Sequence, residues 1–136
     1  MLELNDLLAK AGIDPATTLV MRHRPQEPAL RRVFAWIASE RHDLFNAYQA
    51  TQSRVVEKSL TRAQHVAALV GVDSGSAIFF GLYRHHGVRR WLTREDYWAI
   101  PEHRELGELG MGGFRKDDPR DTIAHFELER LAIAEN

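Results

Sequence analysis

Apolar side chains recur at helical spacing in separate parts of the chain. They predict a short amphipathic helix over residues 3–11 and a longer one over residues 28–40, with Pro28 in its first turn. A third helix is expected over residues 43–52, where Asp43 is a favourable cap. Since an amphipathic helix buries one face, these helices need a common surface to pack against.

Shorter runs rich in β-branched and aromatic residues predict the strands. Residues 17–23 form the first such run, and residues 64–71 and 76–84 flank the turn-forming residues 72–75. This arrangement predicts a β-hairpin with a four-residue loop. Alternating apolar and polar side chains over residues 125–129 predict a last, half-buried strand.

The second arm of the hairpin should lie at the centre of the core. Both of its alternating sets of side chains are apolar, so both faces of this strand should be covered. Phe79 and Phe80 are therefore expected in the core, together with Trp36 of the second helix. Gly81, between them and the end of the strand, permits a bend or a close approach.

Residues 93–110 are expected to form two short helices, because Pro101 interrupts the segment. Thr93 and Asp96 stand at the two positions of a capping box, with Asp in place of the usual Glu or Gln. Residues 115–121 are charged and rich in turn formers, which predicts a surface connection.

These elements predict a single domain over residues 1–136 with an α+β fold. We expect a small, strongly bent antiparallel β-sheet packed against several helices. Gly81 and the doubly apolar strand suggest that the sheet closes into a barrel like that of PUA-type nucleic-acid readers.

Composition narrows the choice of compartment and chemistry. The chain has no cysteine, its first residues are acidic rather than basic, and no apolar run approaches the ~20 residues of a membrane span. A cytoplasmic protein without membrane contact is expected. The seven histidines show no metal-binding spacing, and no nucleophile stands in a catalytic motif, so we predict no metal, no cofactor and no catalytic residue.

Charge is distributed unevenly along the chain. Residues 21–94 carry a net charge of +7, whereas residues 1–20 carry −2 and residues 95–136 carry −6. Gathered on one face, the basic segment would attract phosphate, and the acidic segment would face away from it. The alternative is that the two kinds of charge mix again in the fold.

The basic segment also contains side chains suited to contacting nucleic acid. Arginine and lysine would bind phosphates, amides would pair with base edges, and aromatic rings would stack on bases. The structural alternative is that the rings belong to the core and the amides cap helices. The candidate DNA-binding residues are Arg22, His23, Arg24, Asn46, Tyr48, Gln49, Gln52, Arg54, Lys58, Arg62, Tyr83 and Trp91.

Several segments carry a resemblance to a known family. They are MRHRP at residues 21–25, LFNAYQ at 44–49 and IFFGLY at 78–83, and the likeness extends over nearly the whole chain, through residues 96–101 to residues 126–128. Together they resemble the N-terminal region of bacterial proteins that carry a GIY-YIG nuclease domain farther along. The second half of the nuclease signature does not follow residues 81–83, so no catalytic residue of the family can be placed on this chain.

The resemblance implies an accessory domain that positions a C-terminal nuclease, as in restriction. It would do so by recognising a DNA sequence, a DNA structure or a modified base. We therefore predict non-catalytic binding of double-stranded DNA. Groove binding ranks above flipping of a base onto Tyr48, Tyr83 or Trp91. The alternative is a protein-interaction module, in which basic and acidic surfaces of two copies dock to form a homodimer.

Overall fold

The fold was analysed in a computed structural model, which describes residues 4–23, 29–38, 42–71, 77–109, 111, 114 and 117–132. Arg24 and the predicted turn at 72–75 lie outside these residues, as do five side chains of the second helix (positions 29, 30, 34, 37 and 38). In chain order the elements are α1 (Leu4–Lys10), η1 (Pro15–Thr17), β1 (Thr18–His23), α2 (Ala29–Ala38), α3 (His42–Ala50), α4 (Arg54–Arg62), β2 (His65–Gly71), β3 (Ala77–Thr93), α5 (Arg94–Ala99), α6 (Pro101–Glu108) and β4 (Thr122–Arg130).

The four strands form one sheet in the order β1-β2-β3-β4. The α+β class is confirmed, and β2 and β3 pair antiparallel as the predicted hairpin requires. The prediction of a purely antiparallel sheet is wrong, because β1 pairs parallel with β2. Three helices lie between these strands along the chain, which gives the long crossover that parallel pairing needs.

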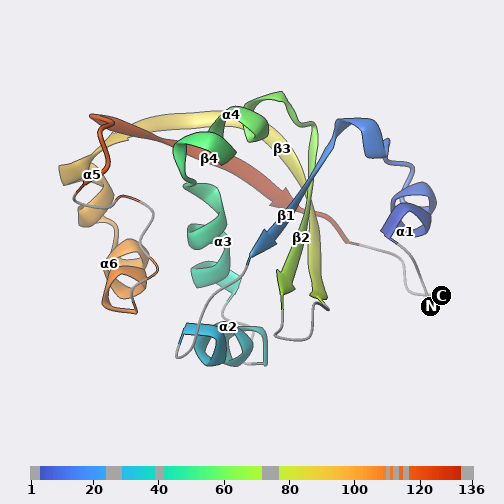
Figure 1. The fold of residues 1–136 in the computed structure, drawn as a ribbon, viewed down its shortest axis with the longest axis horizontal. Coiled ribbons are helices and arrows are strands. Elements are labelled where there is room, and N and C mark those ends of the chain that lie inside the picture. The colour runs from blue at the N-terminus through green and yellow to red at the C-terminus, as the bar shows by residue number, and fades with distance from the viewer. Residues whose placement is uncertain are drawn as a thin grey trace.

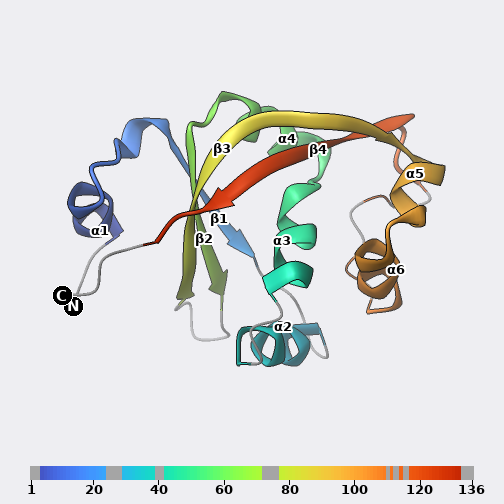
Figure 2. The same cartoon turned by 180° about the vertical axis from the view of Figure 1, so that it is seen from behind.

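The sheet is open rather than barrel-like, because β3 changes partner along its length. Its first part, Ala77–Arg84, pairs with β2, and the part from Tyr83 to Thr93 pairs with β4. In the β2–β3 pairing, the register shifts directly after Ala68, the partner of Gly81. In the β3–β4 pairing, it shifts twice between His85 and Arg90. These irregularities bend the strand, so that β3 and β4 arch over α3 instead of closing onto β1 (Figures 1 and 2).

Helices cover both faces of the β2–β3 pair, as predicted. On the face beneath the arch, Phe45 of α3 stacks on Phe80 of β3 with ring centroids 3.9 Å apart. On the opposite face, Leu8 of α1 packs against Ala67 and Leu82. Trp36 and Phe80 are buried as expected, whereas Phe79 is only half-buried.

Helix α4 is absent from the predicted elements. Its sequence is mostly polar, and it is held to the core by Leu60, which is fully buried, and by the half-buried Val56. The expected cap of α3 also differs, since α3 begins at His42 and Asp43 lies in its first turn. None of the helices in the described residues has the length and apolar character needed to cross a membrane.

The predicted capping box at the start of α5 is confirmed. The Thr93 hydroxyl accepts a hydrogen bond from the Asp96 backbone N–H at 3.1 Å, and the Asp96 carboxylate accepts one from the Thr93 N–H at 3.4 Å. Both bonds satisfy helix-end donors that α5 itself leaves open.

We expect Thr93→Ala to lower the free energy of unfolding by about 1 kcal/mol, because the cap loses its hydroxyl acceptor. Urea unfolding followed by circular dichroism measures the change. Thr93→Ser keeps the hydroxyl and serves as the control, which should stay close to wild type. Equal losses in both variants would show that the hydroxyl bond does not stabilise the helix.

Candidate nucleic-acid interface

One face of α4 carries a line of three exposed cations, which we call the α4 stripe: Arg54, Lys58 and Arg62. Their spacing of four residues places them on the same side of the helix. Val56 and Leu60 face the core instead. The amphipathic packing of α4 thus fixes the direction in which the stripe points.

The stripe borders a surface hollow of about 440 Å³ that Arg54 and Lys58 share with Trp91 of β3. Trp91 is 55% exposed, which is unusual for the largest apolar side chain. Its ring lies on the same surface as the two cations, since all three side chains line this one hollow. The hollow therefore combines positive charge with an aromatic face.

A second hollow of about 470 Å³ continues the first, since both include Arg54 and Pro119. Its other walls come from the end of α3, with Tyr48 and Gln52, and from the start of α4, with Ser53. Burial raises the pKa of the Tyr48 hydroxyl, so this side chain stays uncharged at neutral pH. We call the two hollows together the α4 groove.

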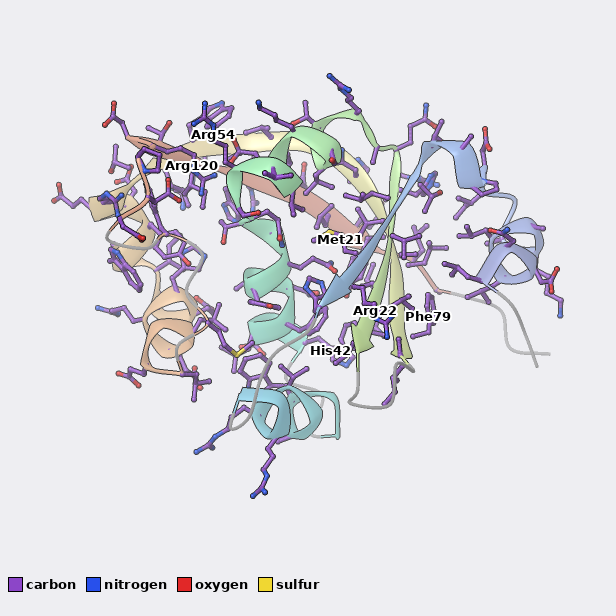
Figure 3. All side chains as sticks on the ribbon, in the orientation of Figure 1. Met21, Arg22, His42, Arg54, Phe79 and Arg120 are labelled. Atoms are coloured by element: carbon purple, nitrogen blue, oxygen red, sulfur yellow. The ribbon has the colours of Figure 1, made fainter. Side chains whose placement is uncertain are left out.

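Arg120 forms the floor of the groove. Its guanidinium donates to the Gln52 carbonyl at 3.1 Å, to the Glu57 carboxylate at 2.8 Å and to the Asp118 carboxylate at 2.7 Å. Glu57 also accepts the backbone N–H of Ala124 in β4. Figure 3 shows Arg120 beside Arg54 at the start of α4.

This contact neutralises acids that would otherwise repel an anion. Hydrogen bonds from Arg120 lower the pKa of Asp118 to about 2, and the same carboxylate raises the pKa of Arg120. The side chains of Glu57, Asp118 and Arg120 are all less than 15% exposed. Arg120 thus pairs with both carboxylates within the wall of the groove.

Three of the predicted DNA-binding residues, His23, Gln49 and Tyr83, are buried, and Asn46 is half-buried beside them. His23 of β1 donates from Nε2 to the Gln49 side-chain oxygen at 3.2 Å, and both side chains are buried. Nearby, the buried Tyr83 hydroxyl donates to Asn46 Oδ1 at 3.2 Å, and burial raises the pKa of Tyr83 to about 12. These groups hold α3 against the sheet, so the expected base reading by Gln49 and base stacking by Tyr83 do not fit the structure.

The remaining candidates are dispersed. Gln52 is half-buried, and its amide N–H donates to the Gln49 and Tyr48 carbonyls. It thus caps the end of α3, which is the alternative to base reading for these amides. Arg22 is exposed on β1, away from Arg54 (Figure 3). The groove therefore brings together five predicted residues: Tyr48, Gln52, Arg54 and Lys58 with Trp91.

The hypothesis that all of residues 21–94 form one basic face is wrong. The exposed Arg31 and Arg32 lie on α2, at the opposite end of the molecule from α4 (Figures 1 and 2). Nor does the acidic segment face away, because the β3–β4 connection brings Asp117, Asp118 and Asp121 to the groove. Of the predicted DNA-binding residues that the structure describes, Arg54, Lys58 and Arg62 form one local basic surface.

Sequence reasoning missed Arg120 and Glu57, and it placed residues 115–121 in a surface connection. No local pattern marks an ion pair between residues 63 positions apart. Among the described residues, no group of three His, Cys, Asp or Glu side chains is arranged to hold a metal ion.

Comparison with known proteins found no matching family model, curated protein or solved structure. The resemblance to the accessory region of GIY-YIG nucleases therefore stays a prediction.

We expect Arg120→Ala to lower the free energy of unfolding by about 3 kcal/mol, because it leaves two largely buried carboxylates without their partner. Arg104 of α6 is exposed, and Arg104→Ala should change stability by no more than about 0.5 kcal/mol. Denaturant unfolding at neutral pH gives both values. A loss for Arg120→Ala no larger than for the control would contradict the role assigned to this side chain.

The interior histidines make stability depend on pH. Burial lowers the folded-state pKa of His23 below 6.5, and burial does the same for His103 and His125. Since the unfolded chain then binds more protons, stability should be greatest above pH 6.5 and fall as the pH drops below it. Unfolding free energies at pH 7.5, 6.5 and 5.5 test the direction. His23→Gln should make the decline shallower, and an unchanged slope would assign it to other groups.

Proposed function

We propose that the protein binds DNA through the α4 groove, without catalysis, and that it favours DNA with an unpaired base. The observation that carries this proposal is the exposed Trp91 beside Arg54 and Lys58. An aromatic ring next to cations is the combination that proteins use on single strands, where bases stack and phosphates pair with charges. A fully paired duplex keeps its bases out of reach of such a ring.

The α4 stripe supports phosphate binding. Arg54 and Arg62 are eight residues apart on one helix face, about 12 Å along the axis at 1.5 Å per residue. This length equals about three to four phosphate steps of one strand, which rise 3.4 Å each in a duplex, so the three cations can contact three phosphates of the same strand. Arg120 pairs with Glu57 and Asp118 beside the stripe, whereas Asp117 and Asp121 are exposed acids that also line the groove.

Sequence-specific reading by amides receives no support from the positions of the candidates. Gln49 is fully buried, Asn46 accepts from Tyr83, and Gln52 donates to backbone carbonyls. The proposal is therefore sequence-tolerant binding. It retains the earlier expectations of a cytoplasmic protein and of a linked nuclease that the bound domain would position on DNA.

Fluorescence anisotropy with a labelled 20-nucleotide strand and its duplex, at 50 and 200 mM salt, tests the proposal. The single strand should bind more tightly, with log affinity falling against log salt with a slope of about −2 for three phosphate contacts. Trp91→Ala should weaken single-strand binding about tenfold, whereas Trp91→Phe should retain most of it. Arg54→Gln with Lys58→Gln should weaken binding and flatten the salt slope.

Arg32→Gln is the matched control, because it removes an exposed cation at the opposite end of the molecule. Equal loss in this variant would mean that attraction is diffuse rather than localised in the groove. Absence of binding to either probe at 50 mM salt would refute DNA binding. A mass that rises with concentration in the absence of DNA, measured by sedimentation, would favour the self-association alternative.

A further inference from the structure

A separate cavity of about 370 Å³ lies between α3, α6 and β4. None of its lining residues belongs to the α4 groove, because the two sites use different sides of α3. Phe126, Leu128 and Ile100 give it apolar walls, and buried histidines and several acids supply polar groups. Small-ligand sites combine an apolar wall with polar groups that orient the ligand, and this half-open hollow has both.

His103 of α6 presents a hydrogen-bond acceptor to this cavity. Its side chain is only 1% exposed, and its ring stacks on Tyr97 with centroids 4.0 Å apart. Nδ1 lies 2.9 Å from the Tyr97 carbonyl, which can only accept, so Nδ1 carries the proton and Nε2 has a lone pair. The side-chain Nε2 of Gln49, which also lines the cavity, is buried and has no hydrogen-bond partner among the described residues.

A second imidazole adds to this unsatisfied polarity. His125 of β4 lines the same cavity, with its ring centroid 6.3 Å from that of His103. Its Nδ1 atom is buried and has no hydrogen-bond partner among the described residues. Buried polar atoms normally have a partner in the protein, a water or a ligand, so two such atoms at one cavity indicate an occupant.

The charges around the cavity indicate the class of occupant. Glu102 of α6, Glu127 of β4 and Asp43 of α3 line it, against one cation, the exposed Arg89 of β3. An excess of carboxylates next to a neutral imidazole acceptor favours a cation that donates hydrogen bonds and disfavours an anion.

We propose that the cavity binds a small organic amine, with its ammonium group donating to His103 Nε2 and to the carboxylates of Glu102 and Glu127. The aliphatic part of the ligand packs on Phe126 and Leu128. This site is independent of the α4 groove, and neither proposal requires the other.

Isothermal titration of the full chain with 1,4-diaminobutane at pH 7.5 and 0.15 M salt tests the proposal. One diamine should bind per chain, and 1,4-butanediol, which has the same length without charge, should bind at least tenfold more weakly. Glu102→Gln should weaken diamine binding about tenfold. Glu108→Gln removes an exposed acid from the same helix outside the cavity and should leave the affinity unchanged.

His103→Asn examines the acceptor directly, because it keeps a donor near the position of Nδ1 and removes Nε2. It should weaken the diamine at least fivefold while circular dichroism remains that of wild type. If it unfolds, Glu127→Gln at an exposed position gives the second measurement, with the same expected loss. Three outcomes would overturn the proposal and leave water as the occupant. The diamine and the diol could bind equally, Glu102→Gln and Glu108→Gln could have equal effects, or the amine could give no heat of binding.

Discussion

The arrangement of the groove depends on the contacts of one side chain, Arg120. From the connection before β4 it reaches the carbonyl of Gln52 after α3, the carboxylate of Glu57 on α4 and its own neighbour Asp118. Through Glu57 it also reaches the backbone of β4. Charge-assisted bonds of 2.7 to 2.8 Å in a mostly buried setting are strong and directional. Two regions far apart in sequence, residues 52–57 and 118–124, are therefore held in one geometry.

Local sequence patterns predicted most of the elements, because their causes are local. The amphipathic helices, the β2–β3 hairpin and the Thr93 capping box all follow from periodicity or from residues three positions apart. The failures are non-local. The parallel pairing of β1 with β2 depends on helices between them, and the extension of β3 to Thr93 depends on β4 as a partner. Helix α4 was missed because a few buried contacts, mainly that of Leu60, outweigh its polar sequence.

The candidate site was harder to predict, because residue type does not reveal which side of a helix faces the core. Asn46, Gln49 and Gln52 looked equivalent as potential readers of bases. In the structure, Asn46 bonds to the buried Tyr83, and Gln49 bonds to the buried His23. Gln52 instead donates to a backbone carbonyl at the end of α3. The four-residue spacing of Arg54, Lys58 and Arg62 was visible in the sequence, but its meaning depended on a helix that the sequence did not predict.

Helix α3 connects these observations. Asn46 and Ala50 line the cavity that contains His103 and His125, and Tyr48 lines the α4 groove, so one helix supplies a wall to each site. Stacking of Phe45 on Phe80 and the polar contacts of Asn46 and Gln49 fix this helix on the sheet. Arg120 then fixes the chain directly after it. Because these contacts are made within the protein itself, they hold both walls in place, and less conformational entropy is lost when either site is filled.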